Sequence, residues 1–206
     1  RLQAFAPNVL ITYPSCAEAL AQAQAEGRLR LRLSEVWVGG EQLTPEQRTR
    51  IRAAFGCPLR NSYGASECYA MAWECTEGRL HLNHDWLILE PVDRDLRPVP
   101  PGEASHEVLL TNLANRTQPL LRYRLSDSVR MPGGRCACGS GFPMLEVQGR
   151  ADHTLHMCDA QGRPVTLLPL ALCTAIEEGA QVTRFQVLRT AADRLELCFE
   201  AEVSDP

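Results

Sequence analysis

The sequence contains no lysine, so all 21 of its Lys+Arg residues are arginines. Schiff-base chemistry needs an amine nucleophile and a Walker-type phosphate loop needs a lysine after its glycines, so both are excluded. There is also no run of about 18 apolar residues, which excludes a membrane-spanning helix. No serine stands in a G-x-S-x-G elbow, which excludes the usual nucleophile of an α/β-hydrolase.

The sequence also lacks an excess of positive charge. Its formal net charge is -4 and its pI is near 5.8, so we expect no nucleic-acid partner. The nine cysteines are odd in number and irregularly spaced, which argues against a secreted disulfide framework and favours a reduced, cytoplasmic protein. With 206 residues, 45% of them hydrophobic, the chain is long enough for one globular domain and part of a second.

Short apolar runs alternate with helix-start signals over the first 60 residues. Ser15 and Glu18 have the spacing of a capping box, and so do Thr44 and Gln47. We therefore expect strands over 9–12, 35–38 and 57–60, and helices over 16–26 and 44–55. This alternation predicts an α/β sheet, and ligands of such sheets usually bind at the strand ends.

After residue 86 the sequence changes to strands separated by turns rich in proline and glycine. We expect strands over 86–90, 107–111 and 144–147, which would form a β-rich layer. A second change near Gly149 precedes an expected helix over 169–178 and strands over 184–189 and 194–203. The predicted fold class is therefore α/β, with one domain over 1–148 and a small α+β lobe over 149–206.

Two segments combine aromatic, hydroxyl and carboxylate groups near expected strand ends. In Asn61-Ser-Tyr-Gly-Ala-Ser-Glu67, the tyrosine ring can stack on a base, Ser66 can donate to a phosphate oxygen, and Glu67 can hold a divalent cation. In Arg122-Tyr-Arg-Leu-Ser-Asp127, the aspartate can accept both hydroxyls of a ribose. Taken alone, the first segment also fits an ordinary turn and the second an ordinary strand end.

Four segments in order resemble successive motifs of the adenylate-forming ligase superfamily: Val38-Gly-Gly-Glu41, Tyr63-Gly-Ala-Ser-Glu67, Tyr123-Arg-Leu-Ser-Asp127 and Gly149-Arg-Ala-Asp152. The branch that the chain resembles contains the phenylacetate-coenzyme A ligases and related capsular-polysaccharide and deazaflavin-coenzyme synthetases. The resemblance implies part of the large adenylate-forming domain, followed by a truncated C-terminal lobe. It also implies that a small carboxylic acid is activated with Mg-ATP to an acyl-adenylate, and that coenzyme A then takes the acyl group.

The resemblance further implies a set of nucleotide contacts. The adenine pocket would be formed by residues 39–41 with Tyr63 stacked on the ring, and Ser66 would contact the α-phosphate. Glu67 would bind magnesium and Asp127 the ribose. Arg150 would close on the nucleotide, and Asp152 would be the hinge of the small lobe. The implied cofactor-binding set is Gly39, Gly40, Glu41, Tyr63, Gly64, Ser66, Glu67, Asp127 and Arg150.

The chain departs from the family pattern in several places. Leu125-Ser126-Asp127 stands where the family has Thr-Gly-Asp, nothing resembles the Gly/Ser/Thr-rich phosphate loop, and the adenylation lysine is missing. We therefore expect a distal fragment of a longer enzyme, with no catalytic residue of its own and inactive when isolated. The alternative is a zinc-stabilised, catalytically inactive module that binds nucleotide or another protein. An incomplete domain would expose apolar surface and form a homodimer.

Two pairs of metal-ligand residues occur far apart in the sequence. Cys75 and His81 have the spacing C-x5-H, and Cys136 and Cys138 form C-x-C between glycines. Zinc takes four sulfur or nitrogen ligands, and the resembled branch includes members with such a cluster. We expect a structural Zn²⁺ site with Cys68 and His84 as substitute ligands. The alternative is that Cys75 is a small core residue and that Cys136 and Cys138 lie in an inert loop.

Overall fold

The computed structural model describes residues 1–151, 155–159, 161–180, 182 and 185–199. The chain divides into two compact units, Arg1–Ala151 and Asp152–Pro206. A short helix, α1 (Leu2–Phe5), precedes the first strand. The proposed hinge residue Asp152, and residues 184 and 200–203 of the strands expected near the C-terminus, lie outside the described residues.

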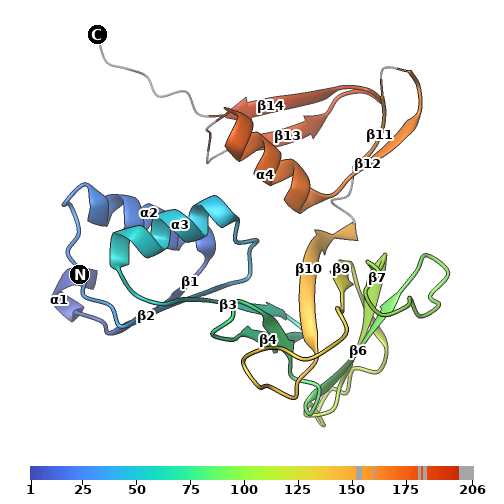
Figure 1. Cartoon of the computed structure of the whole chain (residues 1–206), viewed down its shortest axis with the longest axis horizontal. Helices are drawn as coiled ribbons and strands as arrows, with labels where there is room; N and C mark the ends of the chain where they lie inside the picture. The colour runs from blue at the N-terminus through green and yellow to red at the C-terminus, as the bar shows by residue number, and fades with distance from the viewer. Residues whose placement is uncertain (152–154, 160, 181, 183–184, 200–206) are drawn as a thin grey trace. The chain divides into compact units, whose positions relative to one another are not determined.

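One mixed sheet runs through the first unit, with the strand order β1-β2-β3-β4-β5-β10-β9 (Figure 1). The first three strands, β1 (Val9–Thr12), β2 (Glu35–Gly39) and β3 (Leu59–Ala65), are parallel. Parallel neighbours need a crossover connection, which the helices α2 (Pro14–Ala25) and α3 (Pro45–Phe55) supply. The antiparallel part of the sheet consists of β4 (Cys68–Glu74), β5 (Leu80–Leu82), β10 (Met144–Arg150) and β9 (Asp127–Arg130).

The two crossover helices start in different ways. The capping box predicted at the start of α3 is confirmed, because Thr44 Oγ1 accepts from the backbone N–H of Gln47 and Gln47 Oε1 accepts from that of Thr44. Gly56, with a φ of +64°, ends this helix in the left-handed conformation that glycine favours. The capping box predicted at Ser15 is wrong: α2 already starts at Pro14, which places Ser15 inside its first turn.

Both crossover helices pack on one face of the parallel strands, as Figure 1 shows. Ile51 of α3 is fully buried there, and burying a side chain of this size contributes about 1.5–3 kcal/mol. On the opposite face of β1, Val9 and Ile11 are exposed. The buried core under the helices consists of Leu10, Ala17, Ala21, Leu31, Leu33, Val36, Val38, Ile51 and Leu59.

A second sheet packs against the antiparallel part of the first. It contains β6 (Leu87–Val92), β7 (Glu107–Asn112) and β8 (Tyr123–Leu125), all antiparallel. The two sheets share a core made of Tyr63, Met71, Ala72, Leu82, Leu87, Leu89, Val108, Leu110, Leu125, Val129 and Leu145. This sheet contains two of the strands expected for the β-rich layer, and the third, β10, belongs to the mixed sheet.

The second unit contains two hairpins and one helix. The first hairpin pairs β11 (Leu155–Cys158) with β12 (Pro164–Leu167), and the second pairs β13 (Phe185–Arg189) with β14 (Leu195–Phe199). Helix α4 (Pro169–Ala180) connects them and begins at the residue that the sequence predicted. None of the helices in the described ranges combines the length and the apolar composition that crossing a bilayer requires.

Candidate functional site

The carboxyl ends of the parallel strands meet at one edge of the mixed sheet. Strand β2 ends at Gly39, and the chain turns at Gly40 with a φ of +80°. A Cβ atom on Gly39 would lie 2.4 Å from Ser62 Oγ and 2.9 Å from the Ser62 carbonyl oxygen on the neighbouring strand β3. Glycine is therefore required at position 39 by a close backbone approach and at position 40 by its left-handed conformation.

The residue after these glycines links the turn to a helix. Glu41 Oε2 accepts a hydrogen bond of 3.1 Å from the backbone N–H of Ser15, in the first turn of α2. The first N–H groups of a helix lack partners within the helix, and the positive end of the helix dipole favours a carboxylate. Glu41 therefore holds the Gly39-Gly40 turn against the start of α2.

The next predicted segment lies mostly within a strand. β3 starts at Leu59, two residues later than expected, and continues through Tyr63 to Ala65. Gly64 stands at a β-bulge, and a Cβ atom there would lie only 1.8 Å from the carbonyl oxygen of Tyr69. This close approach leaves no room for a side chain and fixes the turn to β4. Ser66 is exposed in that turn and Glu67 is half-buried.

The buried tyrosine of this segment bonds to the aspartate of the other segment. Tyr63 Oη donates to Asp127 Oδ2 over 2.6 Å, and both residues are largely buried. Burial, with the negative charge of Asp127 adding to it, raises the pKa of Tyr63 far above its usual value, so the phenol keeps its proton and donates. Arg150 faces Asp127 across the β9–β10 pair, with its Nη1 3.9 Å from Asp127 Oδ1.

A second tyrosine–carboxylate contact runs in the opposite direction between the same two segments. Tyr123 Oη donates to Glu67 Oε1 over 3.2 Å. Tyr123 lies in β8, directly opposite Leu110 of β7, whereas Glu67 lies in the β3–β4 turn. The structure thus joins Tyr63, Asp127 and Arg150 in one group, and it connects Glu67 to the three-stranded sheet.

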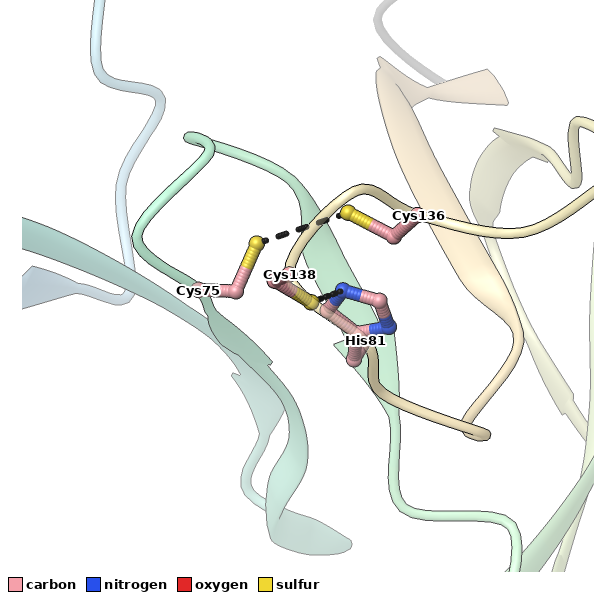
Figure 2. Close-up of side chains that lie close together, drawn as sticks. All are labelled: Cys75, His81, Cys136 and Cys138. Atoms are coloured by element: carbon pink, nitrogen blue, oxygen red, sulfur yellow. Dashed lines mark hydrogen bonds between the residues drawn. The ribbon is translucent and has the colours of Figure 1, made fainter.

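The four predicted zinc ligands lie together. Every ligand atom of Cys75, His81, Cys136 and Cys138 is within 4.8 Å of the others. Figure 2 shows these four side chains gathered in one place. Cys75 follows β4 and His81 lies in β5, while Cys136 and Cys138 come from the loop before β10. Pairing of β5 with β10, with His81 opposite Met144, brings this loop to the first two ligands.

Hydrogen bonds around the cluster orient its donor atoms. His81 is fully buried and its Nδ1 lies 2.9 Å from the carbonyl oxygen of Phe142. Because a carbonyl only accepts, Nδ1 carries the proton and Nε2, which is 3.4 Å from Cys138 Sγ, is left as the ligand atom. The backbone N–H of Ser140 donates to Cys138 Sγ over 3.4 Å.

The thiols of the cluster form no disulfide, and the pKa of one of them, Cys75, is lowered. The Cys75 and Cys136 sulfurs are 3.8 Å apart, far beyond the roughly 2.05 Å of a disulfide. Burial opposes ionisation of Cys75, but backbone N–H donors of Arg79 and Glu77, together with His81 and Cys138, outweigh it and lower the pKa of Cys75 to about 7. Thiolate is the form that binds a metal ion.

The two substitute ligands suggested by the sequence lie outside the cluster. Cys68 packs against the core between the two sheets, where burial raises the pKa of its thiol. His84 packs edge-on against Phe142, with ring centroids 5.1 Å apart. Among the described residues, the grouping of Cys75, His81, Cys136 and Cys138 is the one that offers a metal ion four ligands.

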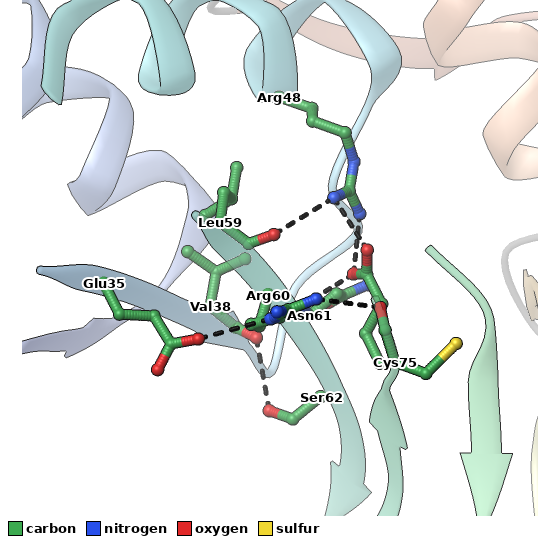
Figure 3. Close-up of polar contacts among 9 residues, drawn as sticks. Glu35, Val38, Arg48, Leu59, Arg60, Asn61, Ser62 and Cys75 are labelled. Atoms are coloured by element: carbon green, nitrogen blue, oxygen red, sulfur yellow. Dashed lines mark hydrogen bonds and ion pairs between the residues drawn. The ribbon is translucent and has the colours of Figure 1, made fainter. Parts of the chain in front are cut away.

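A polar network that the sequence did not predict joins α3, β3 and β4 next to Cys75 (Figure 3). Arg48 of α3 donates to both carboxylate oxygens of Glu74, over 2.9 and 2.8 Å, and the backbone N–H of Asn61 donates to Glu74 over 2.7 Å. Arg60 donates to the backbone carbonyl of Cys75 over 3.0 Å. The network thus fixes the backbone of Cys75, a predicted metal ligand, to β3, and its partners are too distant in sequence to be paired by spacing alone.

Comparisons with known proteins agree with the fold. The structure resembles 2-hydroxyisobutyryl-CoA ligase in complex with R3-HIB-AMP, with a TM-score of 0.80 at 21% identity over 95% of this chain and 44% of that chain. It also resembles the anthranilate CoA ligase AuaEII in complex with anthranoyl-AMP, with a TM-score of 0.66 at 17% identity over 91% of this chain and 37% of that chain. The predicted α/β fold of the adenylate-forming ligases is therefore confirmed.

Two curated proteins are also similar to this chain in sequence. The chain is 28% identical over 135 residues to Protein CapK of Staphylococcus aureus, covering 64% of this chain and 28% of that protein. It is 29% identical over 166 residues to the phenylacetate-coenzyme A ligase of Pseudomonas putida, covering 73% of this chain and 36% of that protein. It thus spans about a third of the length of these curated relatives. Because residues 1–106, just over half of its length, match the AMP-binding enzyme family, the chain belongs to that family.

Proposed function

We propose that this chain is the nucleotide-binding part of a ligase that activates a carboxylic acid with ATP to an acyl-adenylate and then passes the acyl group to coenzyme A. Its family membership and its similarity to a phenylacetate-coenzyme A ligase support this assignment. The observation that carries it is the group formed by Tyr63, Asp127 and Arg150, because three residues of three separate sequence motifs contact one another.

The proposed nucleoside contacts fit the donors and acceptors at this edge. An ionised carboxylate has about four lone-pair sites, and Tyr63 uses one site on Oδ2, so Asp127 keeps enough acceptors for both ribose hydroxyls. The adenine would lie beside the turn formed by Gly39, Gly40 and Glu41, whose glycines let Ser62 and the ring of Tyr13 pack closely against the turn and so fix its shape. Tyr63 is 9% exposed and lies in the core shared by the two sheets, so only the uncovered part of its ring would stack on the adenine.

The phosphate groups would meet the turn between β3 and β4. Ser66 is exposed there and can donate to the α-phosphate, and the half-buried carboxylate of Glu67 is one residue away. Mg²⁺ is usually held by one or two carboxylates together with substrate phosphates, so this donor set fits it. Bound magnesium would neutralise phosphate charge, and Arg150 would add a second positive charge.

The Cys75, His81, Cys136 and Cys138 cluster is proposed to hold a structural zinc ion. Two sulfurs bound to zinc at about 2.3 Å with tetrahedral angles lie roughly 3.8 Å apart. The sulfurs of Cys75 and Cys136 are separated by 3.8 Å, and Cys138 Sγ and His81 Nε2 by 3.4 Å. Four protein ligands leave no open position for substrate, so the ion would join β4, β5 and the loop before β10 without taking part in the reaction.

The ligase assignment is tested by acid-dependent exchange of pyrophosphate into ATP, measured with the complete gene product and a panel of aryl and alkyl acids that includes phenylacetate. We expect exchange with at least one acid. Glu67→Gln should lower it about a hundredfold because the metal contact is lost. Glu103→Gln, which changes an exposed carboxylate, is the matched control. Absence of exchange with every acid would overturn the ligase assignment.

A second candidate function is a zinc-stabilised module that binds nucleotide or protein without catalysis. Two observations favour it: the sequence has no lysine, whereas the four-ligand cluster is intact. For the same reason we propose that the 206-residue chain is inactive by itself. A complete gene product that binds AMP and zinc but exchanges no pyrophosphate would establish this alternative.

Three broader predictions accompany the ligase proposal. Gly149 and Arg150, where the sequence predicted the start of the small lobe, belong to β10 of the first unit, so we propose that the lobe is the second unit and that it rotates relative to the first. Three thiol ligands require reducing conditions, which supports a cytoplasmic location. The exposed apolar face of β1 supports self-association as a homodimer.

A further inference from the structure

Two segments of the candidate site share one sequence pattern, a tyrosine four residues before a carboxylate. In the first segment these residues are Tyr63 and Glu67, and in the second they are Tyr123 and Asp127. The hydrogen bonds between the segments are reciprocal: Tyr63 donates to Asp127 over 2.6 Å and Tyr123 donates to Glu67 over 3.2 Å. Each tyrosine therefore contacts the carboxylate of the other segment.

We propose that these four residues form a tyrosine clasp, in which each phenol positions one carboxylate for a different part of the bound nucleotide. Tyr63 is the positioning residue for Asp127 and the ribose diol, and Tyr123 is the positioning residue for Glu67 and the magnesium ion. The clasp rests on the proposed function, since it takes from there the ribose and metal contacts of the two carboxylates.

The Tyr63–Asp127 bond has the properties of a strong positioning contact. It is a short bond from a hydroxyl to an ionised acceptor in a largely buried place, where charge-assisted hydrogen bonds are strong. The backbone beside Asp127 and Arg150 is also fixed, because the N–H of Ala151 donates to the carbonyl of Ser126 over 2.5 Å. With Oδ2 held by Tyr63 and Oδ1 facing Arg150, the plane of the Asp127 carboxylate is set before a nucleotide arrives.

The Tyr123–Glu67 bond is longer and more exposed, so its contribution is smaller. Its role is to connect the β3–β4 turn to strand β8. Glu67 lies in a turn, whereas Tyr123 lies in β8, which pairs with the buried strand β7. A turn carboxylate that is free to rotate would lose rotamer entropy on binding a metal ion, and a hydrogen bond to a rigid strand reduces that loss.

The experiment separates positioning from simple structural support. Binding of AMP and of 2′,3′-dideoxyadenosine monophosphate to the complete gene product is measured by calorimetry for wild type, Tyr63→Phe and Tyr69→Phe. Tyr63→Phe keeps the ring for stacking and should weaken AMP binding about tenfold, while binding of the dideoxy analogue, which has no diol, should change less than about twofold. Tyr69 is 83% exposed, so Tyr69→Phe should match wild type with both ligands.

The Tyr123–Glu67 half of the clasp is tested by measuring how ATP binding depends on the Mg²⁺ concentration. For Tyr123→Phe, we expect the Mg²⁺ concentration that gives half-maximal ATP binding to rise about threefold, with metal-free AMP binding unchanged. Melting temperatures of all variants are recorded beside the binding data. A lower melting temperature together with equal losses for AMP and the dideoxy analogue would assign the bonds a structural role and overturn the clasp.

Failure of the clasp and failure of the proposed function give different results. If wild type binds AMP but neither tyrosine variant changes the preference for the diol or the need for magnesium, the clasp is wrong and the proposed function stands. If wild type binds no adenine nucleotide at all, the proposed function is wrong and the clasp is overturned with it.

Discussion

At the scale of single residues, the buried carboxylate of Glu74 depends strongly on its hydrogen-bond partners. It is only 4% exposed, and it accepts hydrogen bonds from Nη1 and Nη2 of Arg48 and from the backbone N–H of Asn61. Removing a charge from water costs several kcal/mol, so a buried carboxylate depends on its partners. The Arg48 side chain is 31% exposed, and it can turn to solvent if Glu74 is lost.

Because Glu74 is buried and Arg48 is partly exposed, we expect substitution of Arg48 to lower the free energy of unfolding more than substitution of Glu74. Arg48→Met should lower the free energy of unfolding by about 2–3 kcal/mol because it leaves a buried negative charge, whereas Glu74→Gln should cost about 1 kcal/mol because glutamine can still accept from Asn61. Urea unfolding measures both. Arg50→Met, which breaks the more exposed pair with Glu18, is the control and should cost less than about 1 kcal/mol. Equal costs at Arg48 and Glu74 would contradict this explanation.

Gly64 gives a second prediction at this scale. A Cβ atom there would lie 1.8 Å from the Tyr69 carbonyl oxygen, so Gly64→Ala must push β3 away from β4 and displace Glu67. We expect a loss of about 2–4 kcal/mol in unfolding free energy and at least a tenfold weaker affinity for Mg-ATP. Gly133→Ala is the matched control, since nothing lies within 4 Å of its added atom, and it should change stability by less than about 0.5 kcal/mol. An unaltered Mg-ATP affinity in Gly64→Ala would contradict the predicted displacement.

At the scale of elements, the cluster of Cys75, His81, Cys136 and Cys138 connects β4, β5 and the loop before β10, where the pairing between strands is short. Strand β5 has three residues, and the loop that carries Cys136 and Cys138 has no regular secondary structure. Among the described contacts, the pairing of β5 with β10 covers only two residue pairs, Met144 with His81 and Leu145 with Leu80. Short pairings of this kind are weak, so a bound ion would contribute much of the local stability.

Metal removal should therefore destabilise this region. After treatment with a strong zinc chelator, we expect the melting temperature to fall by about 10 °C, and Cys136→Ser protein should contain well under one zinc per chain by elemental analysis. Cys16→Ser, which changes an exposed cysteine outside the cluster, should keep both the metal and the melting temperature. Protein purified without added metal that contains no zinc and melts normally would rule the site out.

At the scale of the whole molecule, the edge strand β1 exposes an apolar face. It is the first strand in the sheet order, and it exposes Val9 at 45%, Ile11 at 70% and the adjoining Tyr13 at 55%. Helices α2 and α3 cover only the other face of this strand. An exposed apolar edge strand of this kind favours association with another chain.

Ile11→Arg tests this expectation. Because Ile11 is exposed, the substitution should change the free energy of unfolding by less than about 0.5 kcal/mol, yet it should shift the chain toward monomer in sedimentation velocity experiments. Arg52→Ala, which changes an exposed residue of α3, should leave the association state as in wild type. Association that is unchanged by Ile11→Arg would show that another surface is responsible.

The sequence alone determined the features that depend on local chemistry and on motif order. Thr44, Gln47 and Gly56 set the limits of α3 because capping acts within a few residues. Strand β4 was missed because its apolar residues do not alternate: both Met71 and Ala72 are buried beside the bulge at Gly64. The resemblance to the family could be recognised because four motifs occur in order along the chain, and the family match over residues 1–106 confirms it.

Only the tertiary structure decided which distant side chains meet. Tyr63 and Asp127 are 64 residues apart, and Arg48 and Glu74 are 26 apart, so their contacts follow from strand pairing and helix packing that no local pattern encodes. The grouping of Cys75 with Cys136 differs, because the types of ligand residue and the family resemblance predicted it, and the pairing of β5 with β10 brings it about. Local sequence fixes which groups a segment presents, and long-range burial of apolar strands fixes which groups face each other.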